Sequence, residues 1–480
     1  MPALPPVKYD NFKNGLITEG AVSRQYFPDD ALQESLNVHF DRLGCATLRL
    51  GTTLLGNQLT GNILGLYEFR DSGSGSNNQI IAVNGTIAYY LSGSTWTSTR
   101  TGLTSGSNAE FTTFVDQVFM VNGTEATALW DGAPATAWST GGNASSAPTG
   151  KYIENFRSRV WISGNTTNPD RLYYSSNPSS AAVITWDTGS TGQWIDISPS
   201  DGENITGMKR SKTFLLVFKP NHIYRVASIT TTEPDPVVDV GTRSHRSIVA
   251  TKDGIYFHHS SGFYKYTNDG VARDLSLPIS DIVKNITLAN YTKVTGWTDG
   301  DHVYWAVGNV TISGVTYTNL VVRYTISSET WTHYSYPQQY LALSNYNDST
   351  TLFQLVGDDN GNVLKVNVGV TDNSTQVSYS LITKPFTIDG LDSTRKTVSK
   401  LLFLHEGGNG SKVQYQVEGD PRSDWSKTLG QLSDVDTLFT SAGIKGRRIR
   451  FRISGSSLGE AFSFFGIEIL GGTNELLTFT

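Results

Sequence analysis

The chain has 480 residues, a formal net charge of −6, 17% charged residues, 47 glycines, 22 tyrosines and 10 tryptophans. Its length exceeds the size at which one compact core keeps growing, so we expect several domains or one large repeat architecture. The composition favours strands and tight turns over long salt-bridged helices, which predicts an all-β protein. The mild negative charge argues against the basic surface with which duplex-DNA-binding proteins neutralise phosphates.

The N-terminal segment, residues 1–60, is expected to form strands that close a ring or contact a neighbouring subunit. It begins MPALPPVKYD, without the positively charged start and apolar run of a secretory signal, so no signal is expected. Cys45 is the only cysteine, which excludes an intrachain disulfide and a multi-cysteine zinc site. No window of the sequence approaches about 18 consecutive apolar residues, so no membrane span is expected.

Residues 61–370 carry a repeat. A short run of β-forming residues recurs, and successive runs begin about 45 residues apart, the length of a four-stranded propeller blade. The runs are IIAV at Ile80, VFMV at Val118, VWIS at Val160, LLVF at Leu215, IYFH at Ile255, VYWAV at Val303 and LFQLV at Leu352. We predict a β-propeller of about seven blades, within a range of six to eight. The Asn-Gly-Thr that follows two of the runs, first at Asn84-Gly85, is interpreted as a tight turn between strands.

Residues 371–480 lose this rhythm, and alternating strands with glycine-rich turns indicate a separate, small β-sandwich-like domain. The predicted strands are 398–406, 411–419, 447–455 and 461–470. This part contains 12 basic and 12 acidic residues, so the whole charge of −6 belongs to residues 1–370.

One strand of this domain, KGRRIRFRIS, carries candidate contact residues. Arg448, Arg450 and Arg452 alternate with apolar residues, which places three guanidinium groups on one face of a strand. One interpretation is a half-buried sandwich strand with a solvated face. The other is a contact stripe for an acidic neighbouring subunit or for passing nucleic acid.

The sequence lacks motifs for catalysis or metal binding. The histidines include no HExxH, and the adjacent His258 and His259 would point to opposite faces of a strand. The run from Asp358 to Asn362 resembles half of a calcium loop without the closing Glu, and is interpreted as a polar hairpin tip. No nucleophile elbow or nucleotide-binding glycine motif has a suitable setting. We expect no catalytic, cofactor or metal site.

Residues 11–55 resemble the opening of the tail nozzle and packaged-DNA stabilisation proteins of short-tailed bacteriophages. The resembling pattern consists of an aromatic residue before Gly-Leu from Phe12 to Leu16, a Pro and acid cluster from Pro28 to Leu32, Leu36-Asn37 before a strand, and Arg49-x-Gly51. The order of parts, a divergent propeller followed by a strand pair such as GRRIRFRISG and FSFFGIEI, is also similar to that family.

The resemblance implies a structural virion protein without catalytic residues. It implies a homohexameric ring at the distal end of the portal and adaptor stack, next to tail fibre or needle proteins, that retains the genome and forms the channel for its exit. Its expected location is the virion tail, after assembly in the host cytoplasm, where a lone cysteine stays reduced. Because tight phosphate contacts would slow ejection, double-stranded DNA is expected to pass without specific binding.

Two other function classes stay open. Surface Trp and Tyr near polar turns would suit a propeller-type glycan-binding protein, and burial of the Trp residues between blades would count against it. A glycoside-cleaving propeller needs two carboxylates roughly 5–10 Å apart in a central pocket, and the sequence names no such pair.

Overall fold

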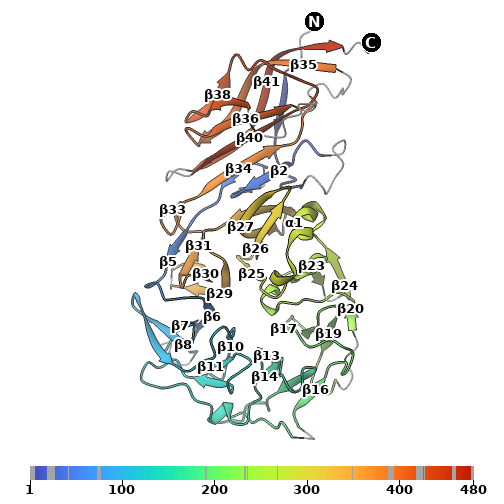
Figure 1. Ribbon diagram of the computed structural model, residues 1–480. Coiled ribbons are helices and arrows are strands. Elements are labelled where there is room, and N and C mark those ends of the chain that lie inside the picture. The colour runs from blue at the N-terminus through green and yellow to red at the C-terminus, as the bar shows by residue number, and fades with distance from the viewer. Residues whose placement is uncertain are drawn as a thin grey trace.

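A computed structural model describes residues 6–18, 27–41, 43–72, 77–189, 192–231, 234, 236–267, 269–348, 350–387, 394–417, 425, 427–456 and 461–476. Strands dominate it, and the helices of this described part are short, such as α1 (Ser280–Asn285); none has the length and apolar character that crossing a membrane requires. Figure 1 shows a ring of sheets with a stack of strands above it. The prediction of an all-β protein with a propeller and a β-sandwich-like domain is confirmed.

Seven sheets follow one another around the ring. Their strands in chain order are β6 (Ile63–Phe69), β7 (Gln79–Asn84), β8 (Ile87–Ser92) and β9 (Thr95–Arg100); β10 (Glu110–Phe114), β11 (Gln117–Val121) and β12 (Ala128–Trp130); β13 (Tyr152–Phe156), β14 (Arg159–Ser163), β15 (Arg171–Tyr174) and β16 (Trp194–Asp196); β17 (Gly207–Arg210), β18 (Leu215–Phe218), β19 (Ile223–Val226) and β20 (Pro236–Val238); β21 (Val249–Thr251), β22 (Gly254–His259), β23 (Gly262–Thr267) and β24 (Val271–Asp274); β25 (Thr295–Thr298), β26 (His302–Ile312), β27 (Val315–Thr325) and β28 (Thr330–Ser335); and β29 (Tyr340–Asn347), β30 (Leu352–Asp358) and β31 (Val363–Val366).

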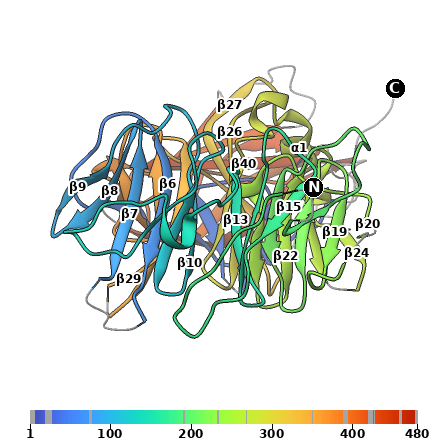
Figure 2. The ribbon, with the colours of Figure 1, turned by 90° about the horizontal axis from the view of Figure 1, so that it is seen from below.

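The first strand of each sheet lies toward the centre of the ring, and the later strands follow outward (Figure 1). Strand β6 contacts both β10 and β29, so the last sheet packs against the first and the ring is closed. Seen from below, β6 to β9 and β19 to β24 stand on opposite sides of this ring (Figure 2).

The middle strands are buried because neighbouring blades cover both of their faces. Residues 80–83 of β7, 118–121 of β11 and all of β18 are buried. These are β-forming runs of the predicted repeat. Gly85 follows β7 with φ +58°, the left-handed conformation that a tight hairpin turn needs, so the turn predicted at Asn84-Gly85 is confirmed.

The N-terminal segment joins the two parts of the molecule. Strand β2 (Leu32–Leu36) lies between β28 of the sixth blade and β34 (Ser378–Thr383). Strand β5 (Thr52–Leu54) pairs with β31 and supplies the outer strand of the seventh blade, and β32 (Thr371–Asp372) and β33 (Thr375–Gln376) continue that sheet. The propeller is therefore closed by residues that precede its first blade.

The sandwich consists of two sheets. One contains β1 (Val7–Asp10), β3 (Val38–Phe40), β4 (Ala46–Leu48), β35 (Thr394–Gly407), β38 (Val435–Phe439), β39 (Ile444–Gly446) and β41 (Phe462–Leu476). The other continues the sixth blade through β2 and β34 to β40 (Ile449–Ser456), β36 (Lys412–Val417) and β37 (Lys427–Gln431).

Aromatic side chains fill the space between the two sheets. Phe403, Phe451 and Phe464 are buried there, and the rings of Phe403 and Phe451 meet edge to face at 5.6 Å. Because strands from the N-terminal segment complete both sheets, the sandwich is not confined to residues 371–480.

Candidate functional site

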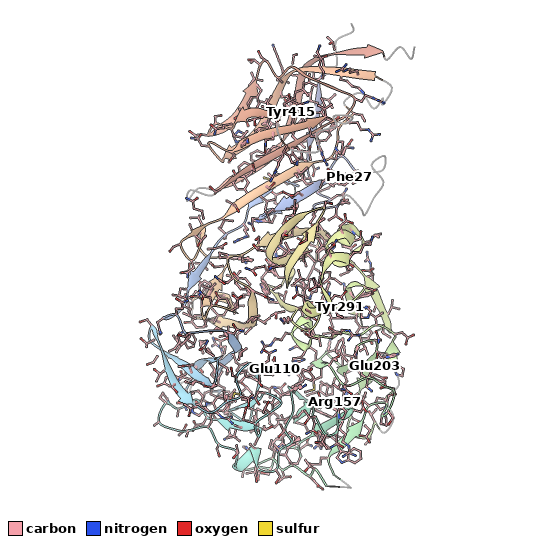
Figure 3. All side chains as sticks on the ribbon, in the orientation of Figure 1. Phe27, Glu110, Arg157, Glu203, Tyr291 and Tyr415 are labelled. Atoms are coloured by element: carbon pink, nitrogen blue, oxygen red, sulfur yellow. The ribbon has the colours of Figure 1, made fainter. Side chains whose placement is uncertain are left out.

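The inner strands of the propeller surround a cavity of about 360 Å³ at the ring axis. Its polar lining includes Glu110, Lys209, His245, Arg246 and Ser344. Figure 3 shows Glu110 near the middle of the ring. Concave polar sites of this kind commonly bind ligands or carry catalytic groups, so the partners of each polar group decide what this cavity can do.

Arg246 crosses this cavity from the 3-10 turn that precedes β21. Its Nε donates to Glu110 Oε1 of the second blade at 2.7 Å. Its Nη1 donates to the carbonyl of Leu341 at 2.6 Å, and its Nη2 donates to the carbonyls of Leu64 and Ala109 at 2.6 and 3.1 Å. One guanidinium therefore ties the fifth blade to the first, second and seventh with charge-assisted hydrogen bonds.

These contacts set the charges at the axis. Burial raises the pKa of Glu110, but Arg246 and His245 outweigh it and hold that pKa below its ordinary value. Burial lowers the pKa of His245 to about 4, so its ring is neutral at pH 7. On the neighbouring inner strand, Glu154 forms an ion pair with Lys209 at 3.3 Å. Glu110 is thus a paired carboxylate, whereas a glycoside-cleaving site needs one carboxyl held protonated.

The Asp358 hairpin tip binds its own backbone. Asp358 Oδ1 accepts the N–H groups of Asn360 and Asn362 at 2.9 and 2.8 Å, and its Oδ2 accepts Asn362 Nδ2 at 2.8 Å. In the part of the chain that the structure describes, no group of three or more His, Cys, Asp and Glu side chains could hold a metal ion. The contacts agree with a polar hairpin tip.

The predicted arginine stripe lies on β40 and just before it. Arg450 Nε donates to Gln416 Oε1 at 2.7 Å, and its Nη1 donates to Gln33 Oε1 at 3.0 Å. Arg452 Nε donates to a serine hydroxyl of β34 at 3.3 Å, and Arg448 is half-buried ahead of the strand. The alternating apolar residues of β40 face the sandwich core, as the pattern predicted. The guanidinium groups of Arg450 and Arg452 are therefore engaged within the chain, and contact of this stripe with another subunit stays a prediction.

Nothing in the sequence points to Lys219, whose side chain has 0% exposed surface. Its Nζ donates to Asp170 at 3.0 Å, to both carboxylate oxygens of Asp201 at 2.8 Å and to the carbonyl of Ser198 at 3.0 Å. In the sequence, Lys219 begins only a turn between two strands. Its carboxylate partners lie 49 and 18 residues earlier, at spacings that match no local motif.

Arg49 forms a second buried ion pair, of which the sequence pattern named only Arg49. Its Nη1 and Nη2 donate to the two carboxylate oxygens of Asp372 at 2.8 and 2.5 Å, and both side chains are at most 4% exposed. Its Nε donates to Asn37 Oδ1 at 2.8 Å, and Nη2 also donates to the carbonyl of Ser335 at 3.0 Å. The guanidinium lies 4.0 Å from the centre of the Tyr336 ring. This cluster connects the N-terminal segment, the sixth blade and β32.

Most tryptophans are internal, which bears on the glycan-binding alternative. Seven of the ten are less than 9% exposed: Trp96, Trp130, Trp161, Trp186, Trp297, Trp305 and Trp331. Buried indole rings fill the spaces in and between blades and cannot stack on a sugar. The burial of these tryptophans counts against the glycan-binding alternative, which stays untested.

No family model matches the chain, and no curated protein matches it. Among solved structures, it is similar to YCF48 from Cyanidioschyzon merolae, with 11% identity, 66% of this chain and 98% of that chain covered, and a TM-score of 0.43. It is similar to the extracellular domain of the hybrid two-component system BT4673 from B. thetaiotaomicron, with 11% identity, coverage of 75% and 45%, and a TM-score of 0.44. It is also similar to the computationally designed Ika8 protein, with 10% identity, 66% of this chain and 100% of that chain covered, and a TM-score of 0.40. At these identities and TM-scores the matches carry no argument about function.

Proposed function

We propose that this protein is a structural virion subunit of a tailed bacteriophage, in the tail nozzle that retains the packaged genome and forms the channel for DNA ejection. One observation carries the proposal. The residues that resemble the nozzle family all lie where the propeller meets the sandwich, so the pattern describes an architecture and not an isolated motif.

The first part of the pattern is anchored in both domains. Phe12 is fully buried in the sandwich core, where its ring stacks on Phe464 at 5.5 Å. Leu16 is fully buried in the core cluster of the sixth blade, and its N–H donates to the carbonyl of Trp331 at 2.9 Å. A separation of four residues therefore bridges two hydrophobic cores.

The second part of the pattern fills the joint itself. Leu36 pairs in parallel with His333 of β28, and Asn37 donates its Nδ2 to the carbonyl of Ser378 at 2.6 Å. Gly51 lies so close to β32 that a Cβ there would come within 2.0 Å of a backbone carbonyl oxygen. Asparagine and glycine suit these positions because one supplies donors and an acceptor and the other leaves room for the chain.

A subunit built this way acts by assembly and steric gating. Because Arg246 crosses the propeller axis, we place the DNA channel between subunits of a six-membered ring and not along the axis of one propeller. The charge of −6 in residues 1–370 suits a wall that DNA passes without specific binding. The proposed neighbours are portal or adaptor head-completion proteins on one side and tail fibre or needle proteins on the other, in a virion assembled in the host cytoplasm.

The test is the oligomeric state of the purified protein, by native mass spectrometry and negative-stain imaging. We expect six-subunit rings with a central opening at least as wide as duplex DNA. Arg448→Ala tests the arginine stripe against Lys284→Ala, which removes an exposed charge from the propeller. Loss of rings only in the first variant, with unchanged thermal unfolding, supports a subunit contact there. Dispersed monomers at every concentration, with no ring in a phage tail, would contradict the proposal.

A further inference from the structure

A second cavity, of about 490 Å³, lies at the rim of the propeller between the fourth and fifth blades. We call it the rim groove. It is formed by the β17–β18 turn, the β21–β22 turn and the end of β23, and its lining includes Arg210, Lys212, Lys252, Asp253 and Tyr266. None of these residues takes part in the axial cluster or in the joint with the sandwich.

The rim groove has an excess of positive charge. Asp253, its lining carboxylate, accepts Lys265 Nζ at 2.9 Å and the Tyr256 hydroxyl at 3.0 Å, so its charge is already balanced. Among the described residues, Lys212 and Lys252 have no ion pair or hydrogen bond through their side chains, and both are exposed. Three cations therefore face the groove without an anion of their own, since Asp253 is paired with Lys265 and the third cation, Arg210, donates to a neutral amide oxygen at 2.6 Å.

A buried hydroxyl also belongs to the rim groove. Tyr266 is 1% exposed; the Arg225 side chain lies beside its hydroxyl oxygen, and its O–H donates to no acceptor in the described part of the chain. A buried O–H without an acceptor is costly, and native proteins normally supply that acceptor from the chain, from water or from a ligand. Tyr266 therefore contributes to the groove lining a hydroxyl whose donor is unused.

We propose that the rim groove binds a small ligand through a phosphate group. Lysine and arginine are the usual partners of phosphate oxygens, a phenol hydroxyl can donate to the same group, and the volume lies in the range of small-molecule sites. The source of the phosphate is either a free polyphosphate or the phosphates of a nucleotide.

The rest of the same propeller face argues for a small ligand over an extended polyanion. The equivalent turn of the third blade carries Arg157, whose Nη2 donates to the carbonyl of Thr213 in the β17–β18 turn at 3.5 Å. The equivalent turns of three other blades carry carboxylates: Asp116 in the second, Asp299 and Asp301 in the sixth, and Asp348 in the seventh. A DNA duplex lying across this face would meet these like charges, whereas a small ligand would contact the rim groove alone.

Isothermal titration of the full-length protein with tripolyphosphate and with ATP tests the proposal. We expect both to bind, with equal affinity if the phosphates alone are recognised and tighter ATP binding if the nucleoside is also contacted. Lys212→Gln/Lys252→Gln is expected to weaken binding at least about tenfold by removing two charge-assisted contacts. The matched control Lys284→Gln/Lys293→Gln, which removes two exposed lysines elsewhere in the propeller, should bind like the wild type.

Tyr266→Phe keeps the ring in the core and removes only the hydroxyl, so it should weaken binding severalfold without lowering the melting temperature. Circular dichroism melting of each variant separates lost binding from lost folding. Absence of binding by the wild type, equal affinity in Lys212→Gln/Lys252→Gln, or duplex DNA displacing tripolyphosphate at equal phosphate concentration would overturn the proposal.

Discussion

Replacing Arg49 by methionine should destabilise the protein more than replacing Arg49 and Asp372 together. In Arg49→Met the Asp372 carboxylate, only 4% exposed, loses both charge-assisted hydrogen bonds from Arg49 and the ion pair with it. Breaking a buried pair by removing one partner costs about 3–5 kcal/mol, because the other charge is left uncompensated. Asn37 and the carbonyl of Ser335 lose a donor as well. In Arg49→Met/Asp372→Asn the stranded charge is gone, so we expect at least about 2 kcal/mol of this loss to be recovered.

Urea unfolding followed by tryptophan fluorescence measures these differences. Nine of the ten tryptophans precede residue 371, so the signal reports mainly the propeller that β5 closes. Because a two-domain chain need not unfold in one step, midpoint and slope are compared for each variant. Hydrogen exchange should show the largest gain in β5 and β2, the strands nearest the lost pair.

Arg273→Met provides the matched control. Arg273 forms a bidentate pair with Glu329, but their side chains are 62% and 54% exposed, so its removal should cost at most about 1 kcal/mol. The reasoning would be refuted if Arg49→Met cost no more than Arg273→Met. It would also be refuted if the double variant were no more stable than Arg49→Met.

Further changes test other parts of the structure. Gly51→Ala should lower the free energy of unfolding by several kcal/mol or prevent folding, since its Cβ would come within 2.0 Å of a backbone oxygen. A near-normal urea midpoint would contradict this close contact between Gly51 and β32. Gly85→Val should cost about 1–2 kcal/mol through its positive φ alone, because nothing lies within 4 Å of the new Cβ, and Gly85→Asn should recover most of the loss. Lys219→Met should lower the free energy of unfolding by about 3 kcal/mol or more, because it leaves the carboxylates of Asp170 and Asp201 without their cation. An unchanged melting temperature would contradict this expectation. Burial lowers the pKa of His258 to about 3 and that of His333 to about 4 from 6.5, so the unfolded chain binds more protons below pH 6.5. The contribution of these two histidines to the free energy of unfolding is therefore complete above pH 6.5 and decreases toward pH 4, by about 2 kcal/mol per histidine near pH 4.5. Equal urea midpoints near pH 7.5 and pH 4.5 would disprove this pH dependence.

The sequence predicts the elements of the propeller well because their signals are local. A buried middle strand must consist of β-forming apolar residues, and a two-residue hairpin must contain a residue that accepts positive φ, so runs such as residues 80–83 and Gly85 show the blade directly. The alternation in β40 likewise shows which face meets the sandwich core. These features depend on neighbours within a few positions along the chain.

The candidate sites are less predictable because their members come from distant segments. Arg246 meets Glu110 across 136 residues, and the cations of the rim groove come from two different blades. Charged residues of this kind look like ordinary surface positions in a sequence, since only the closed ring brings them together. The same holds for Lys219, which reads as part of a turn until its carboxylates are placed beside it.

The all-β class, the repeated blade and the tight turn at Gly85 can each be predicted from the spacing of residue types along the chain. That the N-terminal segment closes the propeller and completes the sandwich is visible only in the folded molecule. Arg49 and Asp372 are 323 residues apart, and the pairing of a buried charge depends on which strands become neighbours after folding. Strand pairing over such distances leaves no periodicity in the sequence, so the joint between the two domains appears only in three dimensions.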